Sequence, residues 1–359
     1  METGGFRIRF PAMALGGLAL LAALWAGLLR MGWTWPVLRP TLPAAHGPLM
    51  IGAFLGTVIA VERAVALRRG WTFVGPVLTG LGGLALIAGL PQPVGPVLIT
   101  LGSVGLVAVF GLILRLETAT YTAVMALAAL LWLVGNGLWL AGWPLAHVVY
   151  WWGGFLVLTI AGERLELGRI LRHSRTVQGM FLASVGLLLV GLLVLLAAYD
   201  LGVRIFAVGT VALALWLLRC DVARYTVRKS GLTRFIAVCL LTGYGWLALS
   251  GLLALVYGGV TAGFLYDAVL HTLYVGFVMA MIFGHAPIIF PAVMGREIPF
   301  STRFYLHLLL LEFSLLLRVA GDLTFWLAAR QWGGLLNAAA ILLFLFNTVL
   351  ALKPNSIHR

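Results

Sequence analysis

The fold is decided by long apolar stretches, of which residues 263–291 form the longest: GFLYDAVLHTLYVGFVMAMIFGHAPIIFP. Only Asp267 in this stretch carries a formal charge when histidine is counted as neutral. A helix needs roughly 20 apolar residues to cross a hydrocarbon core of about 30 Å. The stretch is therefore long enough to cross a membrane as one tilted helix.

Similar stretches fill most of the chain, and we predict about twelve spans in a single transmembrane domain over residues 1–359. The predicted spans cover residues 11–30, 46–67, 71–90, 94–114, 119–141, 144–162, 178–198, 201–218, 232–257, 263–291, 303–326 and 332–352. The seventh and eighth are separated only by Tyr199 and Asp200, which leaves eleven spans as an alternative.

Composition supports this all-α, polytopic membrane fold. Of the 359 residues, 62% are hydrophobic and 10% are charged, whereas soluble globular proteins are about 25% charged. The net charge of +13 comes from Lys and Arg clustered between the apolar runs. Such clusters are typical of topology signals, so we exclude nucleic acid as a partner and expect the lipid bilayer instead. Cys220 and Cys239 have neither the number nor the spacing of a disulfide framework or metal motif.

The positive charges also predict an orientation. They concentrate after the even-numbered spans, at Arg63, Arg68 and Arg69; Arg164, Arg169, Arg172 and Arg175; Arg219, Arg224, Arg228, Lys229 and Arg234; and Arg296 and Arg303. The terminal segments hold Arg7, Arg9, Lys353 and Arg359. Since cytoplasmic connections are enriched in Lys and Arg, both termini are predicted to be cytoplasmic and even-numbered spans to begin at the outer face. We expect a multi-pass protein of a bacterial inner membrane.

An internal repeat relates the second and sixth spans. One reads His46-x15-Glu62-Arg63 and the other His147-x15-Glu163-Arg164, 101 residues later. Four further spans lead to the tenth, which contains His271 near its start. The period of four spans predicts three pseudo-symmetric four-helix units.

Ionisable residues inside a membrane usually face a bundle interior, a cavity or a cofactor. A neutral imidazole is a good axial ligand for haem iron, so His46 and His271 are candidate ligands. Asp267 precedes His271 by one helical turn and could orient its imidazole, or could serve only as an acid near a helix start. For His46 the alternative is a capping or interfacial role.

Two other histidines could serve a second haem. His285 follows His271 by 14 residues, close to four helical turns, so both lie on nearly the same face. The second span has Ala60 at the matching position, and His307 is the candidate for the missing ligand. The alternative for His285 is a hydrogen bond to a backbone carbonyl that Pro287 leaves free.

His147 and Arg318 are further candidates. His147, followed by Tyr150, Trp151 and Trp152, could bind copper, line a cavity, or belong to an interfacial aromatic belt. Arg318 could pair with haem propionates. Its alternative is an ion pair with Asp322, four residues later.

Several of these stretches resemble two known families of membrane proteins. His46-Gly47-Pro48-Leu49-Met50-Ile51 resembles the His-Gly-x-x-Met-Ile segment of haem–copper oxidase subunit I, and His271 with Phe290-Pro291 and Gly295 is similar to the tenth helix of those oxidases. The likeness to the NnrS family of twelve-span membrane proteins containing haem and copper is closer. The stretches of this chain that carry the likeness are His271-Thr272-Leu273-Tyr274-Val275-Gly276 and, loosely, Gly162-Glu163-Arg164.

The resemblance implies an oxidase-like scaffold with one low-spin haem b between His46 and His271, and with His147 in the span that gives oxidases one copper ligand. The oxidase pattern is incomplete, because Val269 occupies the position of the high-spin haem ligand and residues 178–199 contain no histidine. We therefore expect no oxygen-reducing centre. One histidine does not make a copper site, so copper stays open.

The expected function is electron transfer, or sensing or handling of nitric oxide, in exchange with a redox protein or a quinone. Two alternatives remain open. Twelve spans with Gly-Pro interruptions also fit a secondary transporter. A cofactor-free accessory or assembly subunit, bound to other oxidase subunits, would keep the scaffold without the chemistry.

Overall fold

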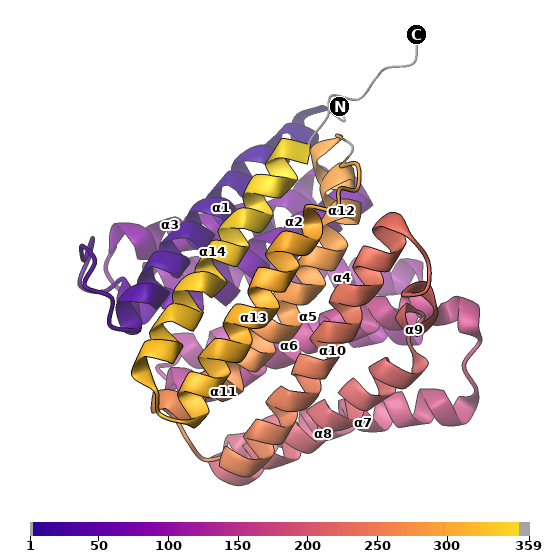
Figure 1. Ribbon diagram of the computed structural model, residues 1–359. Coiled ribbons are helices and arrows are strands. Elements are labelled where there is room, and N and C mark those ends of the chain that lie inside the picture. Colours follow the sequence, from indigo (N-terminus) through magenta and orange to yellow (C-terminus); the bar gives the residue numbers. More distant parts are fainter. Residues whose placement is uncertain (1–2, 297, 352–359) are drawn as a thin grey trace. The chain divides into compact units, whose positions relative to one another are not determined.

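The computed structural model describes residues 3–296 and 298–351 (Figure 1). Lys353, His358 and Arg359, named above from the sequence, lie outside the described residues. The described residues form helices and connecting loops, with no strands. The helices are α1 (Thr3–Arg30), η1 (Pro43–Ala45), η2 (Pro48–Leu55), α2 (Gly56–Leu67), η3 (Gly70–Phe73), α3 (Val74–Ala88), α4 (Val94–Leu116), α5 (Thr120–Leu140), α6 (Leu145–Leu167), η4 (Gly168–Leu171), α7 (Arg175–Leu195), α8 (Tyr199–Cys220), α9 (Ala223–Thr226), α10 (Gly231–Tyr257), α11 (Gly263–His271), η5 (Thr272–Met279), α12 (Ala280–Met294), α13 (Phe304–Leu323) and α14 (Leu327–Ala351).

The part of the chain that is described contains twelve helical segments long and apolar enough to cross a membrane. The chain is thus a multi-pass membrane protein. A turn at residues 196–198 separates α7 from α8, so the count is twelve and not eleven. Most predicted boundaries agree to within a few residues. The largest difference is at the start of α1, which begins at Thr3, eight residues before the predicted position. Helix α14 begins five residues before the predicted position, at Leu327, and α6 ends five residues after it, at Leu167.

Two spans contain a π-helix, which the sequence did not predict. Element η2 begins two residues after His46, and η5 begins directly after His271. Each is eight residues long and passes into an α-helix, α2 or α12. The sixth span, which contains His147, is a regular α-helix along α6. The local backbone therefore distinguishes the second and tenth spans from the sixth.

By internal contacts the chain divides into two compact units, which we describe separately. Unit 1 comprises Met1–Thr159 and Ala292–Met294. In it, α1 packs against η2 and α3, and α4 lies between α3 and α5. Small residues permit close approach of these helices. A Cβ atom on Gly105 would lie 2.9 Å from Cα of Gly75, and one on Gly56 would lie 2.2 Å from the Trp132 ring.

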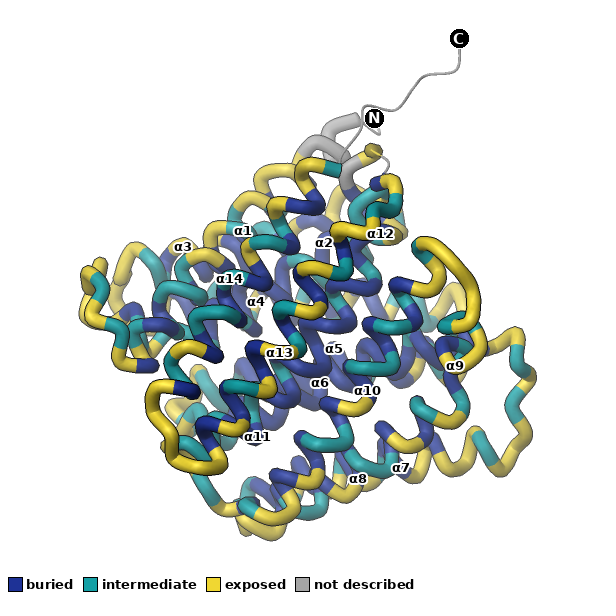
Figure 2. Tube along the Cα trace, viewed as in Figure 1, coloured by how far each residue is buried: buried dark blue, intermediate teal, exposed yellow. Residues whose placement is uncertain are grey.

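Unit 2 comprises Ile160–Pro291 and Gly295–Arg359. Two helical hairpins, α7 with α8 and α13 with α14, flank α10, which also contacts η5 and α11 (Figure 1). Close contacts at glycine hold both hairpins together: a Cβ on Gly202 would lie 2.2 Å from Leu195 N, and one on Gly333 would lie 2.5 Å from Arg318 N. Buried and exposed positions alternate around α13, so one face of this helix packs inside the unit (Figure 2).

Candidate functional site

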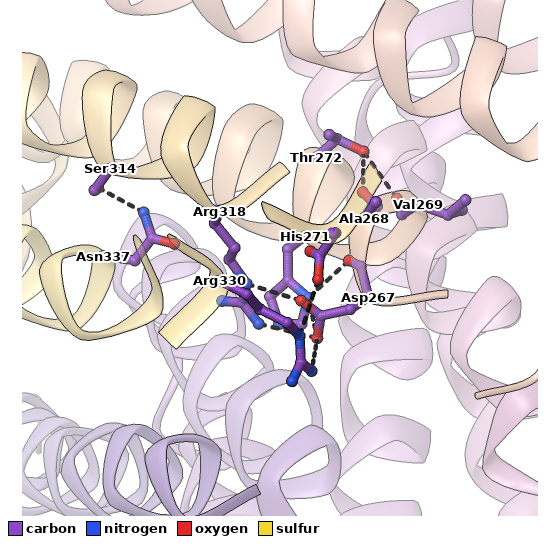
Figure 3. Close-up of polar contacts among 10 residues, drawn as sticks. Asp267, Ala268, Val269, His271, Thr272, Ser314, Arg318, Arg330 and Asn337 are labelled. Atoms are coloured by element: carbon purple, nitrogen blue, oxygen red, sulfur yellow. Dashed lines mark hydrogen bonds and ion pairs between the residues drawn. The ribbon is translucent and has the colours of Figure 1, made fainter. Parts of the chain in front are cut away.

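His271 is the last residue of α11, and its ring is fixed by Asp267 one turn earlier (Figure 3). Nδ1 of His271 lies 3.0 Å from the backbone oxygen of Asp267 and 3.3 Å from its carboxylate Oδ1. Both groups are acceptors, so Nδ1 carries the proton in the neutral ring, and the lone pair is on Nε2. The orienting role predicted for Asp267 is consistent with this geometry.

The Asp267 carboxylate is itself held by two arginines. Arg318 donates to it in a bidentate pair, with Nε at 2.8 Å from Oδ2 and Nη2 at 3.0 Å from Oδ1. Nη2 of Arg330 lies 3.4 Å from Oδ1, and Nε of the same arginine lies 2.9 Å from Asp322 (Figure 3). Two carboxyl groups thus face two guanidinium groups, and the cluster has no net charge when both carboxyls are ionised and His271 is neutral. Such matching is what allows charges to remain inside a membrane protein.

Arg318 has an ion-pair partner that the sequence did not predict. The ion pair that the structure records is with Asp267 on α11, whereas the expected partner within its own helix was Asp322. Asp322 pairs with Arg330 instead. Arg330 was not a candidate, because the predicted twelfth span began after it. The earlier start of α14 places Arg330 in the first turn of that helix. The signal in the sequence was a charged residue next to a predicted span.

His46, in unit 1, is anchored in a similar way. Its Nδ1 lies 2.8 Å from the carbonyl oxygen of Ala23 in α1, so the proton is again on Nδ1. Gly27, one turn after Ala23, makes room for the ring: a Cβ there would lie 2.8 Å from Cε1 of His46. The α1 backbone therefore fixes this imidazole from two sides.

His285 shares the pattern, with Nδ1 at 2.7 Å from the Met281 carbonyl oxygen. The bond goes to a backbone carbonyl, as the alternative interpretation predicted. That carbonyl, however, belongs to the residue one turn before His285 and not to Phe283, four residues before Pro287.

The His307 side chain is buried among other side chains of unit 2. Its Nδ1 accepts from Asn347 at 3.3 Å, and the residue is 1% exposed. Aromatic rings surround it with centroid distances of 4.8–6.0 Å, from Phe235, Phe283, Phe304 and Phe344. Nε2 is buried with no hydrogen bond to any described residue. This environment does not favour the predicted second haem.

His147 lies against Trp143 in an edge-to-face contact, with ring centroids 5.6 Å apart. Nearby, Trp152 donates to Asn136 on α5 at 2.9 Å and contacts Trp139. Trp152 and Asn136 are buried, so this aromatic group packs inside unit 1, and the three alternatives for His147 stay open. Within residues 3–296 and 298–351, no group of three or more His, Cys, Asp or Glu side chains is placed to hold a metal ion.

Comparison with known proteins places this architecture in a family. The sequence profile of a domain of unknown function, DUF8744, matches residues 9–353. The chain belongs to this family. No curated protein matches it significantly. All candidate residues from His46 to Arg330 lie inside the matched DUF8744 domain.

Proposed function

We propose that this DUF8744 protein is a haem b-binding membrane protein in which Nε2 of His46 and Nε2 of His271 are the two axial ligands. The observation that supports this best is the shared local arrangement of the two residues. Each ring has its Nδ1 on a backbone carbonyl, and an eight-residue π-helix begins within two residues after each histidine. π-Helical segments occur frequently at functional sites.

The donor set fits haem iron. A neutral imidazole binds iron through one nitrogen, and a hydrogen bond at the other nitrogen fixes the tautomer and the ring orientation. The Ala23 carbonyl does this for His46, and Asp267 does it for His271. The Asp267 carboxylate also increases the electron density on the His271 ring, because its Oδ1 lies 3.3 Å from Nδ1. Arg318 keeps that carboxylate in place.

The proposed role is electron transfer near the outer face of a bacterial inner membrane, in an oxidase-like scaffold of the kind that the NnrS family suggests. A haem with two histidine ligands supplies one-electron chemistry and has no open position for substrate. Exchange with a redox protein or a quinone therefore fits better than gas turnover. Handling or sensing of nitric oxide would require one histidine to leave the iron.

The test is a pyridine haemochrome spectrum with metal analysis on the purified protein. We expect haem b and a reduced spectrum typical of six-coordinate iron, both lost in His46→Ala and in His271→Ala. His173→Ala is the matched control. His173 lies in the connection between α6 and α7, which is predicted to be cytoplasmic, and its ring packs against Trp216. Colourless protein would contradict the proposal and leave a transporter or a cofactor-free subunit, which a substrate-uptake assay separates.

A further inference from the structure

Glu312 lies in the middle of α13, eight residues after Phe304 and eleven before Leu323. At 1.5 Å per residue this places it about 12 Å and about 17 Å from the helix ends, deep in the hydrocarbon region. Its Oε2 accepts a hydrogen bond from Nε1 of Trp246 on α10 at 2.6 Å. Its Oε1 is buried and has no hydrogen bond to any of the described residues.

The Trp246 donor is held rigidly. Its side chain packs directly against the π-helix η5, where a Cβ atom on Gly276 would be 2.5 Å from Trp246 Cγ. An indole N–H can only donate, and its acceptor can be an ionised carboxylate or the carbonyl oxygen of a protonated carboxyl. The bond therefore orients the carboxyl of Glu312 and leaves Oε1 as the protonation position.

The groups that face Glu312 provide no charge to balance an ionised carboxylate. From α10 come the buried thiol of Cys239 and the hydroxyl of Thr242. That hydroxyl donates to the Cys239 carbonyl and also interacts with the Glu312 carboxyl. On α13 itself, His307 lies five residues before and is engaged with Asn347, and Arg318 lies six residues after and is engaged with Asp267. Across residues 3–296 and 298–351 the structure records no ion pair for Glu312, in contrast to Asp267 and Asp322.

We propose that Glu312 is an intramembrane proton-binding site, with the proton on Oε1 and the Trp246 N–H on Oε2. An uncompensated carboxylate is expensive in hydrocarbon, so the neutral acid is the stable form. The bound proton comes from water and returns to water, and no electron moves. A metal cation would need several oxygen ligands, whereas the neighbouring side chains offer this carboxyl and one hydroxyl. The assignment does not depend on the haem proposal.

Infrared spectroscopy of the full-length protein in liposomes tests the site, with or without cofactor. The spectrum of wild type minus Glu312→Gln should contain one carbonyl band of a protonated carboxyl that shifts in heavy water. Gln keeps an acceptor for Trp246, so the fold should persist. Glu166→Gln, in the predicted cytoplasmic end of α6, is the control and should remove no such band. Loss of carboxylate bands alone in Glu312→Gln would overturn the proposal.

A second measurement on the wild type does not depend on any variant folding. Dicyclohexylcarbodiimide is lipid-soluble, and a protonated carboxyl adds its O–H across one C=N bond to form an O-acylisourea. An acyl shift from oxygen to nitrogen then gives a stable N-acylurea adduct. Mass spectrometry of peptides should find the adduct on Glu312, with labelling that decreases as pH rises and is the same in sodium and potassium buffers. Protection by sodium would show a cation site instead and would overturn the assignment.

Discussion

Gly27 controls how the His46 ring can lie, because the ring packs directly on the α1 backbone. A methyl group at this position would overlap Cε1 and Nδ1 of His46, at 2.8 and 2.9 Å. Gly27→Ala should therefore break the bond from Nδ1 to the Ala23 carbonyl and lower the haem content at least severalfold. Haem per protein, from the pyridine haemochrome, is the measurement.

The same helix offers a control for this substitution. A Cβ on Gly17 would have no neighbour within 4 Å in the described chain. Gly17→Ala should keep its haem and, through better helix propensity, lose no stability. If Gly27→Ala and Gly17→Ala bind equal amounts of haem, the proposed anchoring of His46 is wrong.

Asp267 is the residue that joins His271 to the arginines, and its charge balances that of Arg318. Asp267→Asn keeps the size and removes the charge, leaving the buried guanidinium uncompensated. Breaking one partner of a buried pair costs about 3–5 kcal/mol, so the thermal unfolding midpoint should fall clearly. Loss of the carboxylate should also raise the reduction potential of bound haem, because the His271 ring becomes a poorer electron donor.

A double change separates charge balance from damage to the fold. Asp267→Asn combined with Arg318→Met removes both members of the pair and should recover part of the stability that either single change loses. Strictly additive losses would mean that the two side chains do not depend on each other. Arg330 stays in place throughout as the partner of Asp322.

The contact between Asp267 and His271 was one of two alternatives that the sequence left open, because residues four apart on a helix lie on one face. The sequence did not predict the partner of Arg318, since spacing within one helix says nothing about which other helix lies opposite. The repeat that pairs His46 with His147 was also incomplete evidence. Only the structure shows that the backbone after His46 and His271 is π-helical while that around His147 is regular.

At the level of elements, η5 illustrates why the π-helices escaped prediction. Residues 272–279 have an ordinary apolar composition for a span. The irregular segment occurs where Gly276 allows the Trp246 ring to approach the backbone. Contacts of this kind join residues that are 30 positions apart, and hydrophobic periodicity does not contain them.

Gly276→Ala should displace Trp246, because the added Cβ would lie 2.5–2.6 Å from Trp246 Cγ and Cβ. The indole would then lose Glu312 as an acceptor, and we expect a clear shift of tryptophan emission together with a lower thermal midpoint. Gly245→Ala, on the same helix as Trp246, adds a methyl with no described atom within 4 Å and serves as the control. Unchanged emission in Gly276→Ala would contradict the packing of Trp246 on η5.

For the whole molecule, the twelve spans could be read from the sequence because hydrocarbon admits few polar side chains and requires every backbone group to be paired. Hydropathy alone placed most ends within a few residues, including both ends of α5 and α10 to within one residue. Three four-helix units and an oxidase-like scaffold remain predictions. How three four-span units would be arranged in space depends on contacts between helices. The repeat was found from patterns within single spans, and such patterns do not contain those contacts.

The two native cysteines test the predicted orientation. Cys220 ends α8 beside Arg219 and Arg224 and is partly exposed, whereas Cys239 is 0% exposed. Since even-numbered spans are predicted to run inward, Cys220 should be cytoplasmic. A membrane-impermeant maleimide should then label the protein only after the cells are permeabilised, and Cys220→Ser should abolish the labelling. Cys239 should react only in denatured protein.

A single cysteine placed at exposed Arg39 in the Cys220→Ser background should be labelled in cells whose inner membrane is intact. Labelling of Cys220 without permeabilisation would mean that the true orientation is the opposite of the predicted one. The span ends that contain His46 and His271 would then face the cytoplasm.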